Sequence, residues 1–313
     1  MLEGIIVVAV ALFFVVIVIL IFRFYNKKEK IVLMPSKVSM NQEDFPSFVK
    51  SLKSLINNRF RRILLDFSQV TSLDYESYLV IVAQAEKAFY KDKNVVIYRI
   101  PNNKKVREII LGKNQNRKVY HQTNRFPQLN SDYYLKDAQI TPQITVRIEN
   151  ELKKIGIKDY YEFNTMVSEL VGNAIEHGIK DRNINWWMYH YTDYKTRIIR
   201  FVFVDMGNGI IESYRKAGLP KQYKKMSDDE ILLLALKGVL GSSTKEPNRG
   251  RGLPQIRDMV EKSFISDFVL ITNAVSLRYQ NGMFEQNKHQ NFVGTYYSWT
   301  ISKENFNKWR DRI

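Results

Sequence analysis

Residues 163–180 read FNTMVSELVGNAIEHGIK, and this stretch decides how the second half of the chain is interpreted. Its apolar residues recur at three- to four-residue spacing, as in a helix that buries one face. Glu169 and Asn173 lie one turn apart on another face of the same helix. The stretch therefore predicts an amphipathic helix that presents a carboxylate and an amide to a polar site. The expected core positions are Met166, Leu170 and Ile175.

The composition is that of a globular protein. The chain has 313 residues, of which 45% are hydrophobic and 26% charged, which excludes a disordered protein and allows one large or two modest domains. The absence of cysteine excludes disulfides and thiolate metal sites and suits a reducing compartment. The net charge of +16 fits either a phosphate-rich partner or a solvated basic surface. Because the basic residues are spread along the chain, we favour the solvated surface and do not expect nucleic acid as a partner.

The N-terminal segment is strongly apolar. Residues 5–22 include no charge and no proline, and as a helix they would span about 27 Å, close to the thickness of a bilayer core. The preceding MLEG lacks the basic region of a signal peptide, whereas the basic RFYNKKEK follows the apolar run. The sequence predicts a single-pass transmembrane helix within residues 1–24 and a basic linker over residues 25–30. The N-terminus is then expected outside a bacterial inner or plasma membrane, with the C-terminal domains in the cytoplasm.

Residues 31–125 read as a small α/β domain. The segments KIVLMP, RRILLDFSQV and NVVIYRI are typical of strands, and residues 74–92 are typical of a helix between the second and third of them. A strand, a helix and a strand in this order predict a right-handed parallel crossover. The basic residues 104–125, with seven Lys or Arg against one Glu, are interpreted as a solvated helix and loop rather than a phosphate-facing patch.

The order of these segments, together with LLDFSQVTSLDYESY at residues 64–78, resembles the STAS domain of anti-sigma-factor antagonists. The resemblance implies a regulatory phosphoserine after the aspartate. Here Asp74 is followed by Tyr75 and Glu76, and Ser77 comes one position too late. Either Glu76 supplies a permanent charge or the switch is lost, and we expect a scaffold or interaction role. Residues 126–139 are predicted as a linker or a first strand of the next domain.

Further polar motifs follow the stretch at residues 163–180. NINWWMYHY and TRIIRFVFVD read as two strands joined by a turn at TDYK. The second strand ends in DMGNG, which contains Asp205, Gly207 and Gly209. SSTKEPNRGRGL then precedes a helix, and VGTYYSWTI enters a last strand. These two motifs supply the candidate residues Thr244, Lys245, Arg249, Gly250, Arg251, Gly252, Leu253 and Thr295.

In this order, E-x-x-x-N, D-x-G-x-G, G-x-G-L and G-T resemble the GHKL ATPases, the superfamily of histidine kinases and gyrases. SELVGNAIEHG is most similar to the anti-sigma-factor serine kinases. The resemblance covers residues 140–303, leaves residues 304–313 as a basic tail, and implies ATP and Mg²⁺ as ligands. The implied fold is a Bergerat α/β sandwich with a mixed, mostly antiparallel sheet.

The chemistry of ATP gives each motif a role. Asp205 is expected to accept a hydrogen bond from the adenine amine, while Gly207 and Gly209 would let the backbone approach the base. Asn173 would coordinate Mg²⁺ through its amide oxygen. By resemblance, Glu169 is the general base that polarises a water or an acceptor hydroxyl.

The phosphates need backbone N–H groups at a helix N-terminus, which residues 250–253 would provide. Lys245 and Arg249 or Arg251 are candidates to neutralise the γ-phosphate. Residues 210–249 would form a lid, within which MSDDEILLLALKG predicts a helix with an N-cap and a glycine stop.

The sequence leaves several functions open. A sensor histidine kinase would need a histidine followed by acidic residues and proline, and none of His121, His177, His190 and His289 has that setting. An ATPase or a serine/threonine kinase of the anti-sigma type, acting on a cytoplasmic protein partner, is favoured by Glu169. An ATP-dependent switch with little turnover is favoured by the lack of a recognisable substrate. A nucleic-acid-binding membrane protein is a third alternative, and a homodimer is expected by analogy.

Overall fold

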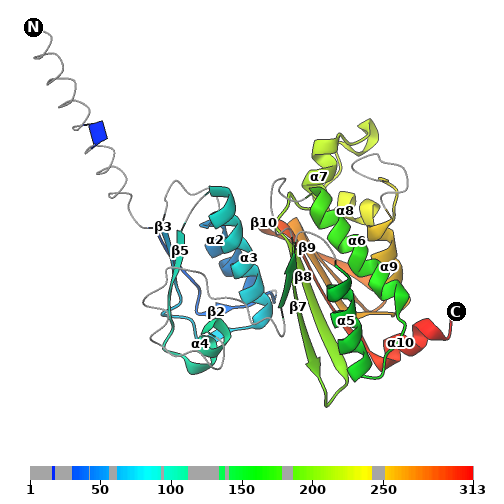
Figure 1. Cartoon of the computed structure of the whole chain (residues 1–313). Coiled ribbons are helices and arrows are strands. Elements are labelled where there is room, and N and C mark those ends of the chain that lie inside the picture. The colour runs from blue at the N-terminus through cyan, green and yellow to red at the C-terminus, as the bar shows by residue number, and fades with distance from the viewer. Residues whose placement is uncertain are drawn as a thin grey trace, which may run out of the picture.

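The computed structural model describes residues 16–17, 30–41, 43–55, 62–92, 95–111, 134–137, 141–177, 186–241 and 251–312. Its elements form four layers, which are a three-stranded sheet, a layer of helices, a five-stranded sheet and a second layer of helices (Figure 1). The fold is therefore mixed α/β, as predicted.

The three-stranded sheet is parallel and belongs to the first half of the chain. Its order is β1 (Lys30–Leu33), β3 (Arg62–Asp66) and β5 (Val95–Arg99). The helix α3 (Tyr75–Asp92) connects β3 to the parallel β5, as the strand–helix–strand pattern predicts. The sequence reading missed α2 (Phe45–Lys53) and the short pair β2 (Lys37–Val38) and β4 (Ser72–Leu73).

The predicted basic helix is present but is not fully solvated. It is α4 (Lys104–Leu111), and its apolar side is buried through Val106, Ile110 and Leu111. Its basic residues occupy the other positions of the amphipathic helix, so α4 has one charged side and one side in the core.

The five-stranded sheet belongs to the second half of the chain, and each neighbouring pair of its strands is antiparallel. The prediction of a mixed, mostly antiparallel sheet is corrected accordingly for the described strands. The first strand lies within residues 126–139, which were predicted as a linker or a first strand of this domain, and it pairs with the second strand. The sheet therefore begins before the expected boundary at residue 140. The strand order is β6 (Tyr134–Asp137), β7 (Trp186–Asp193), β8 (Ile198–Asp205), β10 (Met283–Ser302) and β9 (Ser266–Gln280).

Both faces of this sheet are buried. Side chains alternate along a strand, so Phe201 and Phe203 of β8 point toward the second helical layer while Val202 and Val204 point toward the first. Figure 1 shows α3 along the face that carries Val202 and Val204, and residues of α3 share one core with these two valines. Burial on both sides explains why β7 and β8 read as continuous apolar runs rather than as alternating ones.

The second helical layer includes α6 (Tyr161–His177), which contains residues 163–177 of the stretch FNTMVSELVGNAIEHGIK, whose last three residues lie outside the described part of the chain. Met166 and Leu170 are buried as predicted, but Ile175 is 43% exposed and its prediction as a core residue is wrong. At about 100° per residue, position 174 continues the buried stripe and position 175 turns away from it. Ala174 is buried in its place. The other helices are α5 (Pro142–Lys154), α7 (Ile210–Ala217), α8 (Asp228–Leu236), α9 (Gly252–Glu261) and α10 (Lys303–Arg310), with a 3₁₀ turn at Lys221–Tyr223.

Two segments of the second half are more firmly packed than the sequence predicts. The expected basic tail forms α10, whose Phe306 and Trp309 enter the core. In the expected lid, α8 begins with the predicted capping box of Ser227 and Glu230, and it buries Ile231 completely. The described part of the lid, up to residue 241, is thus anchored to the body of the protein.

The prediction of an N-terminal transmembrane helix is not upheld. Over the part of the chain that the structure describes, no helix is both long and apolar enough to cross a membrane. The apolar run at residues 5–22 lies outside the described residues except for Val16 and Ile17. We correct the fold prediction and withdraw the single-pass location that depended on it.

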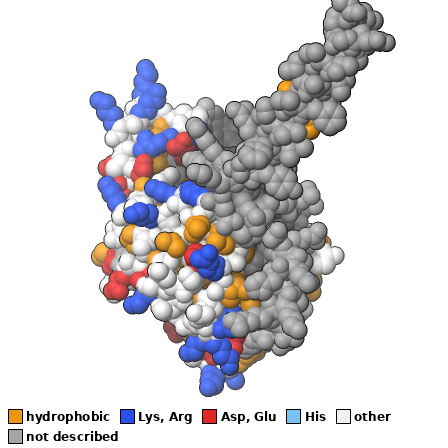
Figure 2. Space-filling model, turned by 90° about the vertical axis from the view of Figure 1, so that its left-hand side faces the viewer, with side chains coloured by type: hydrophobic (Ala, Val, Ile, Leu, Met, Phe, Trp, Pro, Cys, Tyr) orange, Lys and Arg blue, Asp and Glu red, His pale blue; other side chains and the backbone are white. Residues whose placement is uncertain are grey.

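The positive charge is dispersed over the visible face of the first half. Figure 2 shows Lys and Arg side chains scattered among acidic, apolar and uncharged groups on that face. On the described part of this face, the distribution agrees with a solvated basic surface.

The packing of α6 leads to a stability prediction. Phe163 is fully buried, and its ring lies 5.0 Å from that of Phe201 and 6.3 Å from that of Trp299. Phe163→Ala is expected to lower the free energy of unfolding by about 3–5 kcal/mol, because it removes apolar contact and leaves a cavity. Ile175→Ala on the exposed side of the helix should change it by less than about 1 kcal/mol. Urea denaturation of both variants tests this, and equal losses would contradict the assignment of the buried face.

Candidate functional site

The N-terminus of α9 lies against the polar face of α6. A Cβ at Gly252 would be 3.0 Å from Oε2 of Glu169 and 3.2 Å from Nδ2 of Asn173. A side chain at this position would therefore press on both polar groups, and glycine lets the helix begin beside them. The structure thus brings together three predicted site residues that are widely separated in the sequence.

A second group of predicted residues lies at the end of β8. The sheet register pairs Asp205, the last residue of β8, with Thr295 of β10, and pairs Thr295 with Thr272 of β9. Asp205 and Thr295 are two residues from Phe203 and Tyr297, which face the second helical layer. By the alternation of strand side chains, Asp205 and Thr295 lie on the same face of the sheet as α6 and α9.

The close approach of two strands fixes this end of the sheet. Gly294 has a φ of +94°, and a Cβ there would collide with the backbone carbonyl oxygen of Asp205. Both features require glycine at this position. Gly294 is the glycine of the G-T motif, and its lack of a side chain lets β10 approach the end of β8 this closely.

The loop after Asp205 is held by its own backbone and by β9. The Asp205 Oδ1 accepts a hydrogen bond from the Gly207 amide at 2.8 Å. Asn273 donates from Nδ2 to the Asn208 carbonyl at 2.9 Å. Gly209 packs on the same side chain, because a Cβ there would be 2.6 Å from Asn273 Oδ1. The two predicted loop glycines therefore lie in a tightly defined turn.

Two residues of β9 cap the helix that follows this loop. Thr272 Oγ1 accepts a hydrogen bond from the Ile210 amide at 2.9 Å, and Asn273 Oδ1 accepts one from the Ile211 amide at 3.0 Å. These oxygens satisfy the free amides at the N-terminus of α7. The sequence did not predict the capping role of either residue, because a cap supplied by a distant strand has no local sequence signature.

Two buried tyrosines accompany Asp205 on the helix side of the sheet. Burial raises the pKa of Tyr297 well above its ordinary value, and the charge of Asp205 adds to this shift. Burial also raises the pKa of Tyr214 to about 12. Tyr214 donates to the Gly241 carbonyl at 2.7 Å, so it fastens the last described residue of the predicted lid to α7. Both phenols therefore remain protonated at neutral pH.

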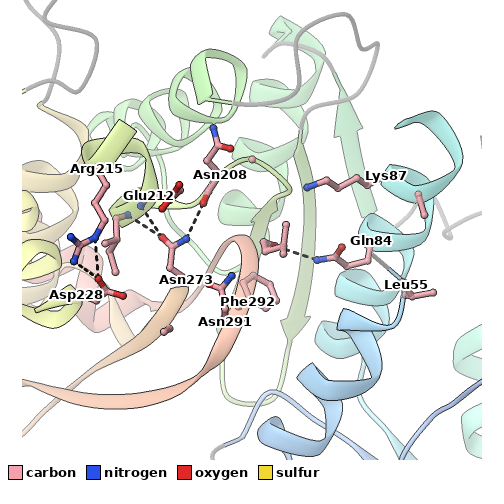
Figure 3. A pocket seen from close by; sticks show the side chains of 15 residues that line it. Leu55, Gln84, Lys87, Asn208, Glu212, Arg215, Asp228, Asn273, Asn291 and Phe292 are labelled. Carbon is pink, nitrogen blue, oxygen red and sulfur yellow. Dashed lines mark hydrogen bonds and ion pairs between the residues drawn. The ribbon is translucent and has the colours of Figure 1, made fainter. Parts of the chain in front are cut away.

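A cavity of about 650 Å³ adjoins the loop on its other side (Figure 3). It lies between α3 of the first half and the loop, α7 and the β9–β10 strands of the second half. Glu169, Asn173 and Gly252 do not line it. The cavity therefore adjoins the Asp205 loop and is separate from the contact between α6 and α9. Its lining includes Gln84, Lys87, Gly207, Asn208 and Asn273.

The remaining predicted site residues are distributed as follows. Arg251 is exposed at the N-cap of α9, whereas Leu253 is buried in the core and serves packing. No group of three or more His, Asp or Glu residues within the described ranges could hold a metal ion by itself. The Mg²⁺ site at Asn173 stays a prediction. Outside the described residues lie Thr244, Lys245, Arg249 and Gly250.

The Gly294 contact can be tested with a matched pair of variants. Gly282 also has a positive φ, of +79°, but a Cβ there would meet no atom within 4 Å. Gly282→Ala should lower the free energy of unfolding by about 1–2 kcal/mol from backbone strain alone. Gly294→Ala adds the collision with Asp205 and should lower it by about 3 kcal/mol or more. Thermal or urea unfolding measures both, and equal effects would show that the strands do not approach as closely as described.

Comparisons with known proteins were made by family, by sequence and by structure. No protein-family model matches the chain, and searches of curated proteins and of solved structures find no match. The geometry of the site therefore has to carry the functional argument.

Proposed function

We propose that this chain binds ATP with Mg²⁺ in a site of the GHKL type and is an ATPase or a serine/threonine kinase that acts on a protein partner. The observation that carries the proposal is the contact of Gly252 with Glu169 and Asn173. Gly252 places the N-terminus of α9 directly beside this carboxylate and this amide, where a side chain would press on both. Such a grouping suits a phosphate chain and its metal, because backbone N–H groups attract anions and oxygen ligands suit Mg²⁺.

The second group of residues supports recognition of the base. Asp205 is 9% exposed and is fixed by the Gly207 amide, so its second carboxylate oxygen has a defined direction. A carboxylate on the helix side of the sheet would accept a hydrogen bond from the exocyclic amine of adenine. Thr295, next to it in the register, would add a hydroxyl.

The chemistry proposed for each residue follows from its place. Glu169, on the polar face of α6, would act as a general base for a water or for the hydroxyl of an acceptor serine or threonine. Asn173, one turn later, would supply an amide oxygen to Mg²⁺. When bound, the metal would supply charge neutralisation on the phosphates. Arg251, exposed at the start of α9, is available to neutralise phosphate charge.

An ATP-dependent switch with little turnover is the second candidate. One observation favours it, namely that the loop after Asp205 contacts the first half of the chain through Lys87. Nucleotide binding at this loop could then be sensed by the other domain without hydrolysis. The general base distinguishes the two candidates, because binding alone does not need one.

The base-binding role predicts a selective loss of affinity. Asp205→Asn should weaken the binding of Mg·ATP about 10- to 100-fold, since a hydrogen bond to a charged acceptor is replaced by a weaker one. Asp267→Asn is the control, because Asp267 is exposed on the same sheet and accepts from Thr300 at 2.8 Å. Isothermal titration calorimetry measures both variants. Failure of the unmodified chain to bind Mg·ATP would refute the proposed function.

The catalytic role predicts that replacing Glu169 lowers turnover but not the affinity for Mg·ATP. Glu169→Gln should keep the affinity for Mg·ATP within about threefold and lower phosphate release or transfer about 100-fold or more. Glu162→Gln, two turns earlier on α6, should leave both unchanged. Radiolabelled ATP, with and without candidate protein partners, gives the measurement. Equal turnover in the Glu169 variant and the unmodified chain would leave the switch as the remaining candidate.

A further inference from the structure

The first half of the chain contacts the candidate site from behind, across the sheet. Helix α3 packs on β7 and β8, and its side chains share a core with the sheet residues that face away from α6 and α9. Trp187 of β7 donates to the Glu86 carboxylate at 2.7 Å, and Tyr75 stacks on Tyr189 at 5.6 Å. The helix is thus fastened along much of its length to the sheet that carries Asp205.

Two residues of α3 reach the backbone of the site itself. Lys87 donates from Nζ to the carbonyl of Met206 at 2.6 Å, and Met206 stands between Asp205 and Gly207. Gln84 donates from Nε2 to the carbonyl of Val293 at 3.2 Å, immediately before Gly294. Figure 3 shows both side chains extending from α3 toward the second half of the chain.

These bonds are made by buried groups. Lys87 is 8% exposed and Gln84 is 1% exposed. A buried ammonium group needs strong acceptors, and a hydrogen bond from a charged donor is about twice as strong as a neutral one. The Met206 carbonyl is therefore held in one position as long as α3 stays docked.

The two contacted backbone segments move together. Gly294 lies directly against the carbonyl of Asp205, so a shift of either segment displaces the other. The cavity of about 650 Å³ borders Gly207 and Asn208 on the α3 side, so side chains rather than close packing support the loop there.

We propose that Lys87 and Gln84 are positioning residues for the base-binding end of the site, so that ATP affinity depends on these two contacts from α3. Lys87 acts through Met206 on Asp205, and Gln84 acts through Val293 on Gly294 and Thr295. The proposal rests on the proposed function, because it assigns to α3 the alignment of the carboxylate that would read adenine.

The experiment compares three variants of the full chain. Lys87→Met and Gln84→Leu remove the donors and leave apolar side chains that are one atom shorter. Tyr75→Ala weakens the same interface at the other end of α3 and touches neither loop. Each variant is measured by urea denaturation, by calorimetry with Mg·ATP, and by hydrogen exchange of the amides at residues 206–209 and 293–295.

Lys87→Met and Gln84→Leu should each weaken Mg·ATP binding about 5- to 50-fold and speed exchange of the loop amides. Tyr75→Ala should change stability but leave ATP affinity within about twofold. Unchanged ATP affinity in both Lys87→Met and Gln84→Leu would overturn the inference while leaving the proposed function intact. An equal loss in Tyr75→Ala would also overturn it, because the effect would then reflect general destabilisation. Absence of binding by the unmodified chain would overturn both, and the exchange rates would still show whether α3 orders the loops.

Discussion

The inner strands of the five-stranded sheet have to bury side chains on both faces, and the rest of the structure depends on this constraint. One face is covered by the helices that contribute Glu169, Asn173 and Gly252, and the other by the first half of the chain. Both covering layers are needed, because β7 and β8 have large apolar side chains on both faces of the sheet and loss of either layer would expose them to water. The candidate site is formed where one of these layers meets the end of the sheet.

Much of this architecture could be predicted from the sequence because it follows local periodicity. The strands around residues 186–205, the helix α6 and the capping box of α8 all have short-range signals. Ile175 was misplaced because a single apolar residue at the edge of a helical stripe does not determine which face is buried. The cap on α7 from Asn273 and the docking of α3 on the sheet depend on contacts between distant segments, for which one sequence carries no local pattern.

The candidate site was foreseen to a similar degree. The motifs identified Glu169, Asn173, Asp205 and Gly252, and packing accounts for their two groupings through helix–helix contact and strand register. Leu253 was assigned to the ligand through its backbone N–H at the start of α9, and this assignment stays a prediction, while its side chain packs in the core. Lys87 was not anticipated, since nothing in the first half of the sequence indicates which backbone carbonyl a lysine will reach.

The shared core also determines how the chain can be handled in pieces. A fragment beginning at residue 134 would turn Trp187, Tyr189, Val204 and Phe292 out into water. A contiguous aromatic and aliphatic patch of this kind promotes self-association. Biochemical dissection would then require polar replacements on that exposed sheet surface, whereas a simple truncation would yield aggregates.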